Sequence, residues 1–237
     1  MKRILVVAAA AALAVIVLAG VAAYAYFFSG LRTSPASLGL SSPAVTSSPT
    51  AGRLAATWKV TTGSVAGYRV QELFAGETSK HLAVARTSNV TGGLTVSGDS
   101  SGYQVSGINL TADLTTLHSV DQVAGRNVSQ RDGIVSRQLE TQQIPYAMFT
   151  ASTASVPGSV TSTPADVTLL GKLTIHAVTR DVTATAHTQV IGDKIEIAGT
   201  MTINMADYGV SPPRAPFVTV DPTATIEFDL FLARSSN

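Results

Sequence analysis

Residues 57–237 alternate apolar and polar side chains with a period of two residues. Turn residues separate the alternating segments, as at Pro157-Gly158 and at Ile191-Gly192-Asp193. The last segment is a clear example, because its even-numbered residues are all apolar: Ile226, Phe228, Leu230 and Leu232. Such alternation is typical of β-strands with one buried face, since successive side chains point to opposite faces. The pattern predicts an all-β, antiparallel domain.

Glycines inside the predicted strands indicate strong curvature. The apolar phase shifts by one residue at Gly107, which predicts a β-bulge or a sharp bend there. Three further strands contain an internal glycine, at Gly67, Gly171 and Gly199. Because strongly curved strands favour closure, we expect a closed or nearly closed antiparallel β-barrel of about eight strands. A β-sandwich with a surface helix is the alternative, since alternation alone separates the two poorly.

Residues 121–141 interrupt the alternation with a stretch rich in charged side chains. Val128, Val135 and Leu139 recur there at spacings of seven and four residues, as on one face of a helix. We expect one or two short helical turns lying across the barrel, interrupted near Gly133.

Residues 4–28 form an uninterrupted apolar run of 25 positions. A helix of this length spans about 37 Å, more than the roughly 30 Å of a bilayer's hydrocarbon core. Lys2 and Arg3 precede the run, so we expect one transmembrane helix, with the rest of the chain in the extracytoplasmic envelope space. The alternative is a signal peptide cleaved after Ala23-Tyr24-Ala25, which would release a secreted protein.

Residues 29–56 are dominated by Ser, Thr, Pro, Ala and Gly. A segment with so few large apolar side chains gains little by becoming ordered, so we predict a flexible linker. The expected organisation is a membrane anchor or signal segment at 1–28, a linker at 29–56 and a barrel domain at 57–237.

Composition and motifs exclude several classes of function. The chain has no cysteine and a formal net charge of +1, so it lacks a thiolate nucleophile and the basic excess typical of nucleic-acid binding. Its four histidines form no zinc-binding motif, and no nucleophile elbow is present. Glu227 and Asp229 stand on the polar face of the last strand, where we expect solvated carboxylates. We therefore predict a non-enzymatic protein without a catalytic site, metal site, cofactor or nucleic-acid partner.

The interior of such a barrel suits an apolar ligand. Barrels of about eight strands have room for packed side chains or for one small ligand. The apolar strand faces are mostly aliphatic, which fits a long isoprenoid or acyl chain. The alternative is that these side chains simply fill the core.

Four groups of short motifs occur in the order found in one family of exported barrels. They are Trp58-Lys59-Val60 with Gly67-Tyr68; Arg131-Asp132 with Leu139-Glu140-Thr141, Pro145-Tyr146 and Phe149; Gly171-Lys172-Leu173-Thr174-Ile175-His176-Ala177-Val178-Thr179; and Met205-Ala206-Asp207-Tyr208-Gly209. On these motifs, residues 57–234 resemble the YceI-like family of exported polyisoprenoid-binding proteins, which have a lipocalin-like antiparallel barrel. Ala177 stands where the family usually has glycine.

The resemblance implies that the barrel holds an isoprenoid chain, of the quinone or polyprenyl phosphate type, for storage or transport near the membrane. The candidate cavity residues are Tyr68, Val70, Leu110, Leu114, Phe149, Leu173, Ile175, Ala184, Ile203, Phe228 and Leu230. The candidate head-group residues are Arg126, Arg131, Arg137 and Arg180. For Arg131, a structural ion pair with Asp132 or another neighbour is the alternative. For the whole protein, the alternative is an envelope interaction domain with a filled barrel on a stalk; the oligomeric state is not predicted.

Overall fold

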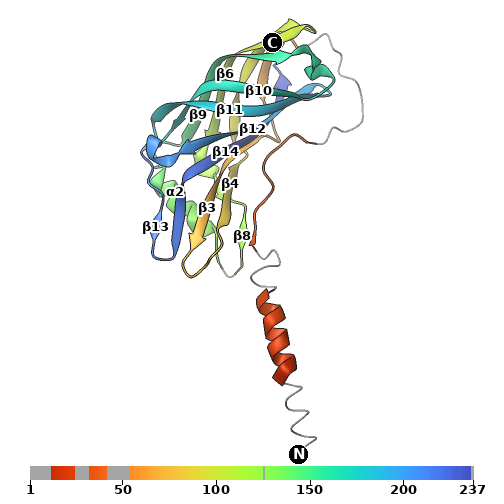
Figure 1. Cartoon of the computed structure of the whole chain (residues 1–237). Coiled ribbons are helices and arrows are strands. Elements are labelled where there is room, and N and C mark those ends of the chain that lie inside the picture. Colours follow the sequence, from red (N-terminus) through yellow and green to blue (C-terminus); the bar gives the residue numbers. More distant parts are fainter. Residues whose placement is uncertain (1–11, 25–31, 42–53, 125, 236–237) are drawn as a thin grey trace, which may run out of the picture.

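The computed structural model describes residues 12–24, 32–41, 54–124 and 126–235. Eight antiparallel strands form a closed barrel in the spatial order β12-β11-β10-β9-β6-β5-β2-β14, and β14 closes it by pairing with β12 (Figure 1). Their bounds are β2 Ala56–Val60, β5 Val90–Asp99, β6 Gly102–Asp113, β9 Tyr146–Pro157, β10 Ala165–Ile175, β11 Val178–Ile191, β12 Lys194–Asn204 and β14 Val218–Arg234. The prediction of an all-β, eight-stranded antiparallel barrel is confirmed.

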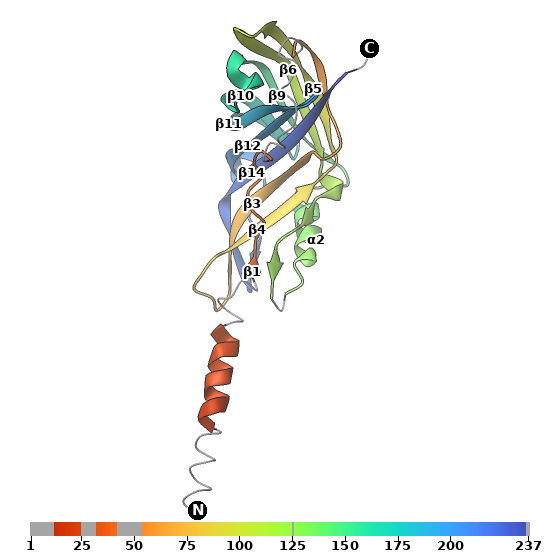
Figure 2. The same cartoon turned by 90° about the vertical axis from the view of Figure 1, so that its right-hand side faces the viewer.

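The remaining elements extend one end of the barrel or line its rim. Strand β14 is long enough to pair with β2 near its C-terminal end and with β3 along the rest, and β4 and β7 continue the sheet beyond β3. These elements and the short ones are β1 Arg32–Thr33, β3 Val65–Phe74, β4 His81–Thr87, β7 His118–Ser119, β8 Gln122–Val123, β13 Arg214–Ala215, α2 Ser129–Gln138, η1 Leu114–Thr116, η2 Gly158–Thr161 and η3 Met205–Tyr208. Figure 2 shows α2 beside the end of the barrel formed by β3 and β4, which we call the α2 end.

The core lies inside the barrel, on the faces that the alternation predicts. Leu173 and Ile175 of β10 are buried, as are Phe228, Leu230 and Leu232 of β14. The expected bulge is also present. Gly107 has a φ of 61°, and the β5–β6 register shifts by one residue opposite it. This conformation is accessible to glycine without a steric penalty.

The turn between β10 and β11 is a two-residue hairpin loop with an unfavourable sequence. His176 and Ala177 connect the strands with φ values of 51° and 59°. Hairpin turns with two positive φ values favour Asn and Gly, because a Cβ atom clashes in the left-handed region. The chain therefore carries local strain at Ala177.

Replacing Ala177 with glycine is expected to raise the free energy of unfolding by about 0.5–1 kcal/mol. The β11–β12 turn offers the reverse test, because Gly192 has a φ of 60° there and Gly192→Ala should lower stability by a similar amount. Urea denaturation of the full chain in detergent measures both. A neutral or destabilising Ala177→Gly would contradict the strain.

Helix α2 differs from the expectation, because it runs without interruption through Gly133. A glycine inside a helix costs only about 1 kcal/mol. Asp132 offsets this cost by accepting hydrogen bonds from the Ser119 amide at 2.9 Å and from the Ser119 hydroxyl at 2.6 Å. These contacts hold one continuous helix against β7.

Residues 12–24 are helical and expose their apolar side chains. Within the described part of the chain, no helix combines the length and apolar character needed to cross a bilayer. The predicted span 4–28 lies partly outside the described residues, so the transmembrane helix stays a prediction.

Residues 32–41, which we call the strap, lie along the outer wall of the barrel. β1 pairs with β8, the Leu38 amide donates to Glu227 at 3.1 Å, and the Ser41 amide donates to Glu196 at 2.7 Å. The prediction of a flexible linker over 29–56 is therefore wrong for residues 32–41. Composition missed this because polar side chains of the barrel, and not apolar packing, hold the strap.

The predicted boundary between the linker and the barrel, after residue 56, is also too late in the chain. Leu54 is buried in the core and accepts a hydrogen bond from the Trp58 indole at 2.9 Å, so the barrel begins before residue 57. The rest of the predicted linker, residues 29–31 and 42–53, lies outside the described residues.

Candidate functional site: an apolar slot with one polar end

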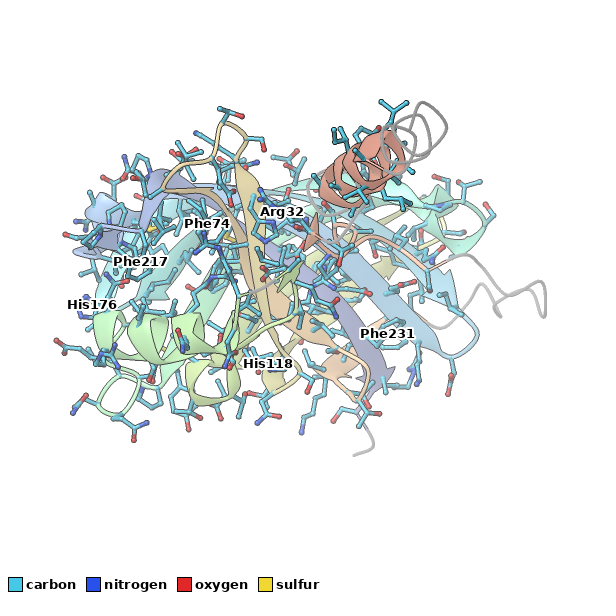
Figure 3. All side chains as sticks on the ribbon, turned by 90° about the horizontal axis from the view of Figure 1, so that it is seen from below. Arg32, Phe74, His118, His176, Phe217 and Phe231 are labelled. Atoms are coloured by element: carbon cyan, nitrogen blue, oxygen red, sulfur yellow. The ribbon has the colours of Figure 1, made fainter. Side chains whose placement is uncertain are left out.

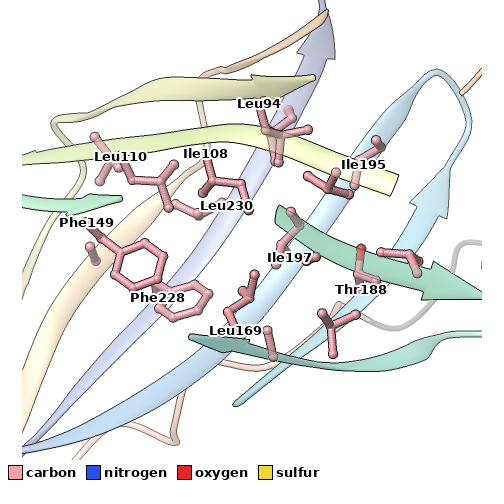
Figure 4. Close-up of a pocket in the computed structure, with 18 of the residues that line it drawn as sticks. Leu94, Ile108, Leu110, Phe149, Leu169, Thr188, Ile195, Ile197, Phe228 and Leu230 are labelled. Atoms are coloured by element: carbon pink, nitrogen blue, oxygen red, sulfur yellow. The ribbon is translucent and has the colours of Figure 1, made fainter. Parts of the chain in front are cut away.

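The barrel encloses a first cavity of about 150 Å³ in the half that contains the β5–β6 turn. Its walls come from the inward faces of the strands, and Figure 4 shows Leu94, Phe149, Phe228 and Leu230 converging on it. No lining residue carries a charge. Thr188 is one of its few polar groups, and its hydroxyl is already bonded to the Glu196 carbonyl at 3.1 Å. This half of the interior suits a hydrocarbon chain.

A second cavity of about 150 Å³ lies toward α2. Its walls are also mainly apolar, but six polar side chains line it: Tyr68, Glu72, Thr87, Arg131, Gln138 and Tyr208. The interior is therefore polar at one end only.

The two cavities adjoin at a waist, which we define by the five residues that line both. Both are lined by Ala66, Ala112, Ala147, Leu173 and Ile226. Ala112 of β6 pairs with Ala147 of β9, so two small side chains lie next to each other at this point. The arrangement fits a slender amphiphile with its tail in the first cavity and its head in the second.

Arg131 is tied into a buried ion-pair network. Its guanidinium lies 2.9 Å from Glu72 Oε1 and 2.7 Å from Asp121 Oδ1. Asp121 also contacts His81 Nε2 at 2.7 Å and accepts the Val84 amide at 3.0 Å. Burial opposes ionisation of Asp121, but the hydrogen bonds from His81 and Arg131 hold its pKa well below the usual range. Burial raises the pKa of Glu72, although the Arg131 charge lowers it in part.

Because two carboxylates face Arg131, the polar end of the slot has no net positive charge from this network. The alternative prediction for Arg131, that it forms a structural ion pair, is confirmed. Its partners are Glu72 and Asp121, whereas Asp132 bonds to Ser119.

Tyr208 lines the second cavity with a hydroxyl group that is buried. The side chain is buried, and its Oη atom has no hydrogen-bond partner among the described residues. Burial raises the pKa of Tyr208, and burial also raises the pKa of Tyr68. Both hydroxyls therefore stay protonated at neutral pH, and the buried Tyr208 hydroxyl keeps a proton that has no acceptor among the described residues.

Most predicted cavity residues line the slot. The first cavity contacts Leu110, Phe149, Leu173, Phe228 and Leu230. The second contacts Tyr68, Val70, Leu114, Leu173, Ile175 and Ile203. Ala184 is fully buried in the core but lines neither cavity. Sequence reasoning missed Tyr208 as a cavity residue, although the Tyr208-Gly209 pair was part of the motif found in this segment.

Of the predicted head-group residues, only Arg131 lines a described cavity. The guanidinium of Arg126 lies 4.1 Å from the centre of the Phe74 ring and 3.8 Å from Glu77. Arg137 and Arg180 are exposed and line neither cavity. Binding of a head group by these side chains stays a prediction.

The described residues contain no cluster of three or more His, Cys, Asp or Glu side chains suited to a metal ion. Three carboxylates instead gather on the outer wall beneath or beside the strap: Glu196, Glu227 and Asp229. Glu196 and Glu227 are fully buried, and one oxygen of Asp229 has no partner among the described residues. The expectation that Glu227 is solvated is wrong, because the strap covers it. Burial and the neighbouring Glu196 raise the pKa of Asp229 to about 6.

The raised pKa of Asp229 predicts a pH-dependent effect of Asp229→Asn. Between its usual pKa near 3.8 and about 6, the folded state binds more protons than the unfolded state, so stability falls as the pH rises. Since Asp229 is partly exposed, we expect Asp229→Asn to stabilise the protein by about 1 kcal/mol at pH 7.5 and by almost nothing at pH 4. Urea unfolding of both proteins at the two pH values measures the difference. A gain of equal size at both values would rule out the carboxylate as its source.

Comparison with known proteins identifies the fold family. The profile of the YceI-like domain matches residues 58–232. The chain belongs to the YceI-like family. The YceI-like domain thus covers the barrel and its cavities, and a barrel of this fold with an apolar interior supports lipid binding.

Several solved structures are similar to this chain at low sequence identity. A polyisoprenoid-binding domain from Saccharophagus degradans, implicated in plant cell wall breakdown, matches with a TM-score of 0.50 and 16% identity over 75% of this chain and 98% of that one. BcnA from Burkholderia cenocepacia matches with a TM-score of 0.45 and 17% identity over 69% and 95%. The Campylobacter jejuni YceI protein matches with a TM-score of 0.38 and 13% identity over 70% and 94%. Among functionally curated proteins, none matches this YceI-like chain.

Proposed function

We propose that the chain is a membrane-anchored lipid-binding protein that holds an isoprenoid chain in its barrel for storage or transport. The proposal rests on the two adjoining cavities, which together form what we call the slot. Its walls are mainly apolar, and its charged side chains lie only at the end formed by the second cavity. Burial of each CH₂ group contributes about 0.8 kcal/mol, so a tail of several isoprene units binds tightly without specific contacts. The proposal is for a binding protein and involves no catalytic step.

The polar end favours an uncharged head group over a phosphate. Glu72 and Asp121 already balance Arg131, so this guanidinium offers a phosphate no net positive charge. A quinone carbonyl needs only a hydrogen-bond donor, and the unpaired Tyr208 hydroxyl supplies one. We therefore propose a quinone-type ligand, with a polyprenyl phosphate as the class to be tested against it.

The proposed location follows from the apolar N-terminal run. Residues 4–28 would cross the membrane with Lys2 and Arg3 on the cytoplasmic side. The barrel would then lie on the extracytoplasmic side, where it meets lipids of the same membrane.

Binding of two ligands with the same tail tests the head-group proposal. The full chain in detergent is titrated with an isoprenoid quinone and with a polyprenyl phosphate of equal length. We expect the quinone to bind at least about tenfold more tightly, because the phosphate loses hydration and meets an Arg131 that two carboxylates already balance. Tighter binding of the phosphate would overturn the quinone assignment, and binding of neither would favour the filled-barrel interaction domain.

Tyr208→Phe isolates the contribution of the hydroxyl. Loss of one hydrogen bond to the ligand is expected to weaken quinone binding about five- to tenfold, since such a bond contributes about 1 kcal/mol. A polyisoprene hydrocarbon without a head group is the matched control and should bind equally to both proteins. An unchanged quinone affinity would show that the head group lies elsewhere.

A further inference from the structure

The strap is fixed at both of its ends. At its start, Arg32 forms two hydrogen bonds to Glu77, at 2.6 and 2.8 Å. At its end, the Ser41 amide and hydroxyl donate to Glu196 at 2.7 and 2.9 Å, and Gln189 donates to the Ser41 carbonyl at 2.9 Å. The contacts spread over the outer wall and hold the whole segment along it.

The barrel needs the strap to complete its buried polar groups. Arg69 and Arg86 both pair with the fully buried Glu227, at 2.6 and 2.9 Å. Their remaining N–H groups donate to strap carbonyls, Arg69 to Pro35 and Arg86 to Ala36. Detachment of the strap would leave these donors without their partners and expose an ion pair that is now buried. The docked arrangement is therefore the stable one.

The strap begins at the α2 end of the barrel. Arg32 pairs with Val123 of β8 and bonds to Glu77, which follows β3. In Figures 1 and 2, residues 12–24 lie beyond this same end. The second cavity, with its polar groups, also lies toward this end.

Chain length then limits how far the barrel can stand from its anchor. From Phe28, the last residue of the proposed span, to Arg32 there are four residue steps, which reach at most about 14 Å. A free 28-residue linker would instead have an average reach of about 30 Å. The α2 end is therefore held within a short distance of the membrane surface.

We infer that the strap fixes the α2 end of the barrel against the lipid surface, so that the second cavity faces the bilayer. The inference rests on the anchoring part of the proposed function. The side chains at this end fit a lipid interface: Phe217 is 53% exposed at the β13–β14 turn, and Arg126 stacks on Phe74. Figure 3 looks onto this end and labels Arg32, Phe74 and Phe217. Aromatic and basic side chains of this kind are enriched at membrane interfaces.

Fluorescence quenching by lipids tests this orientation. The chain has no cysteine, so Phe217→Cys at the α2 end and Ser100→Cys in the opposite β5–β6 turn can each carry one fluorophore. The full-length proteins are placed in vesicles of neutral phospholipid with a head-group quencher. We expect at least about threefold stronger quenching at position 217 than at position 100, because only the first site lies near the anchor.

Two proline variants separate the strap from other causes. Arg32→Ala combined with Leu38→Pro removes the bonds to Glu77 and to Glu227, and is expected to bring the two quenching values within about 1.5-fold of each other. Ser37→Pro is the matched control, since the Ser37 amide has no hydrogen-bond partner among the described residues, and it should leave the threefold difference intact.

Equal quenching at the two positions in the unaltered strap would overturn the inference. So would a difference that survives the combined Arg32→Ala and Leu38→Pro substitutions, or a protein that does not float with the vesicles. None of these outcomes depends on whether the barrel takes up isoprenoid. The quenching experiment therefore tests only the orientation of the barrel at the membrane. The separate ligand titration tests whether the barrel binds isoprenoid.

Discussion

Replacing Ala147 with phenylalanine is expected to weaken isoprenoid binding by at least about 100-fold. Ala147 lines both cavities at the waist, opposite Ala112. A phenyl ring there occupies the passage that the tail must follow from the second cavity to the first. Exclusion of one five-carbon isoprene unit removes about 4 kcal/mol of apolar burial, which corresponds to roughly three orders of magnitude in affinity. Titration of the full chain with an isoprenoid quinone measures the loss.

Thr150→Phe is the matched control on the same strand. Thr150 is exposed on the outer face of β9, so the same ring added there should leave both the slot and the affinity unchanged. Thermal unfolding of both variants shows whether the barrel is intact. An Ala147→Phe protein that is folded and binds the quinone normally would exclude this path for the tail.

Replacing Glu227 with alanine is expected to lower the free energy of unfolding by about 3–5 kcal/mol. Glu227 is fully buried, pairs with Arg69 and Arg86, and accepts the Leu38 amide of the strap. Its removal leaves two guanidinium groups without their carboxylate in a poorly solvated place. Urea denaturation of the full chain in detergent measures the effect.

Asp221→Ala provides the comparison, because the pair of Asp221 with Lys80 is solvent-exposed. Exposed pairs contribute at most about 1 kcal/mol, so this variant should unfold close to the unaltered protein. Similar small losses for both substitutions would mean that the strap does not seal Glu227 from water.

The barrel could be predicted because the sequence patterns that specify it lie within single strands. The period-two alternation of β14 places Phe228, Leu230 and Leu232 inside, and a one-residue phase shift marks the bulge at Gly107. Both features follow from backbone geometry, which allows a strand residue only two directions. The resemblance to YceI-like proteins then predicted a ligand cavity. Ten of the eleven predicted cavity residues line the two cavities, and Ala184 is the exception.

The strap and the polar end could not be predicted in the same way, since both depend on contacts between distant segments. Glu227 stands on the outward face of its strand, and only the docking of residues 32–41 shields it from water. Arg131 reaches Glu72, which is 59 residues away in sequence. Whether an inward face leaves a cavity depends on the summed volumes of all side chains around the barrel, a quantity that periodicity does not contain.

Native mass spectrometry of the full chain, released from membranes in mild detergent, shows whether the barrel carries a lipid. Solvent extraction and identification of the released lipid follow on the same sample. We expect one isoprenoid lipid of the quinone type per protein molecule. A protein that is empty and also fails to take up added isoprenoid quinone would contradict it and would favour the filled-barrel interaction domain.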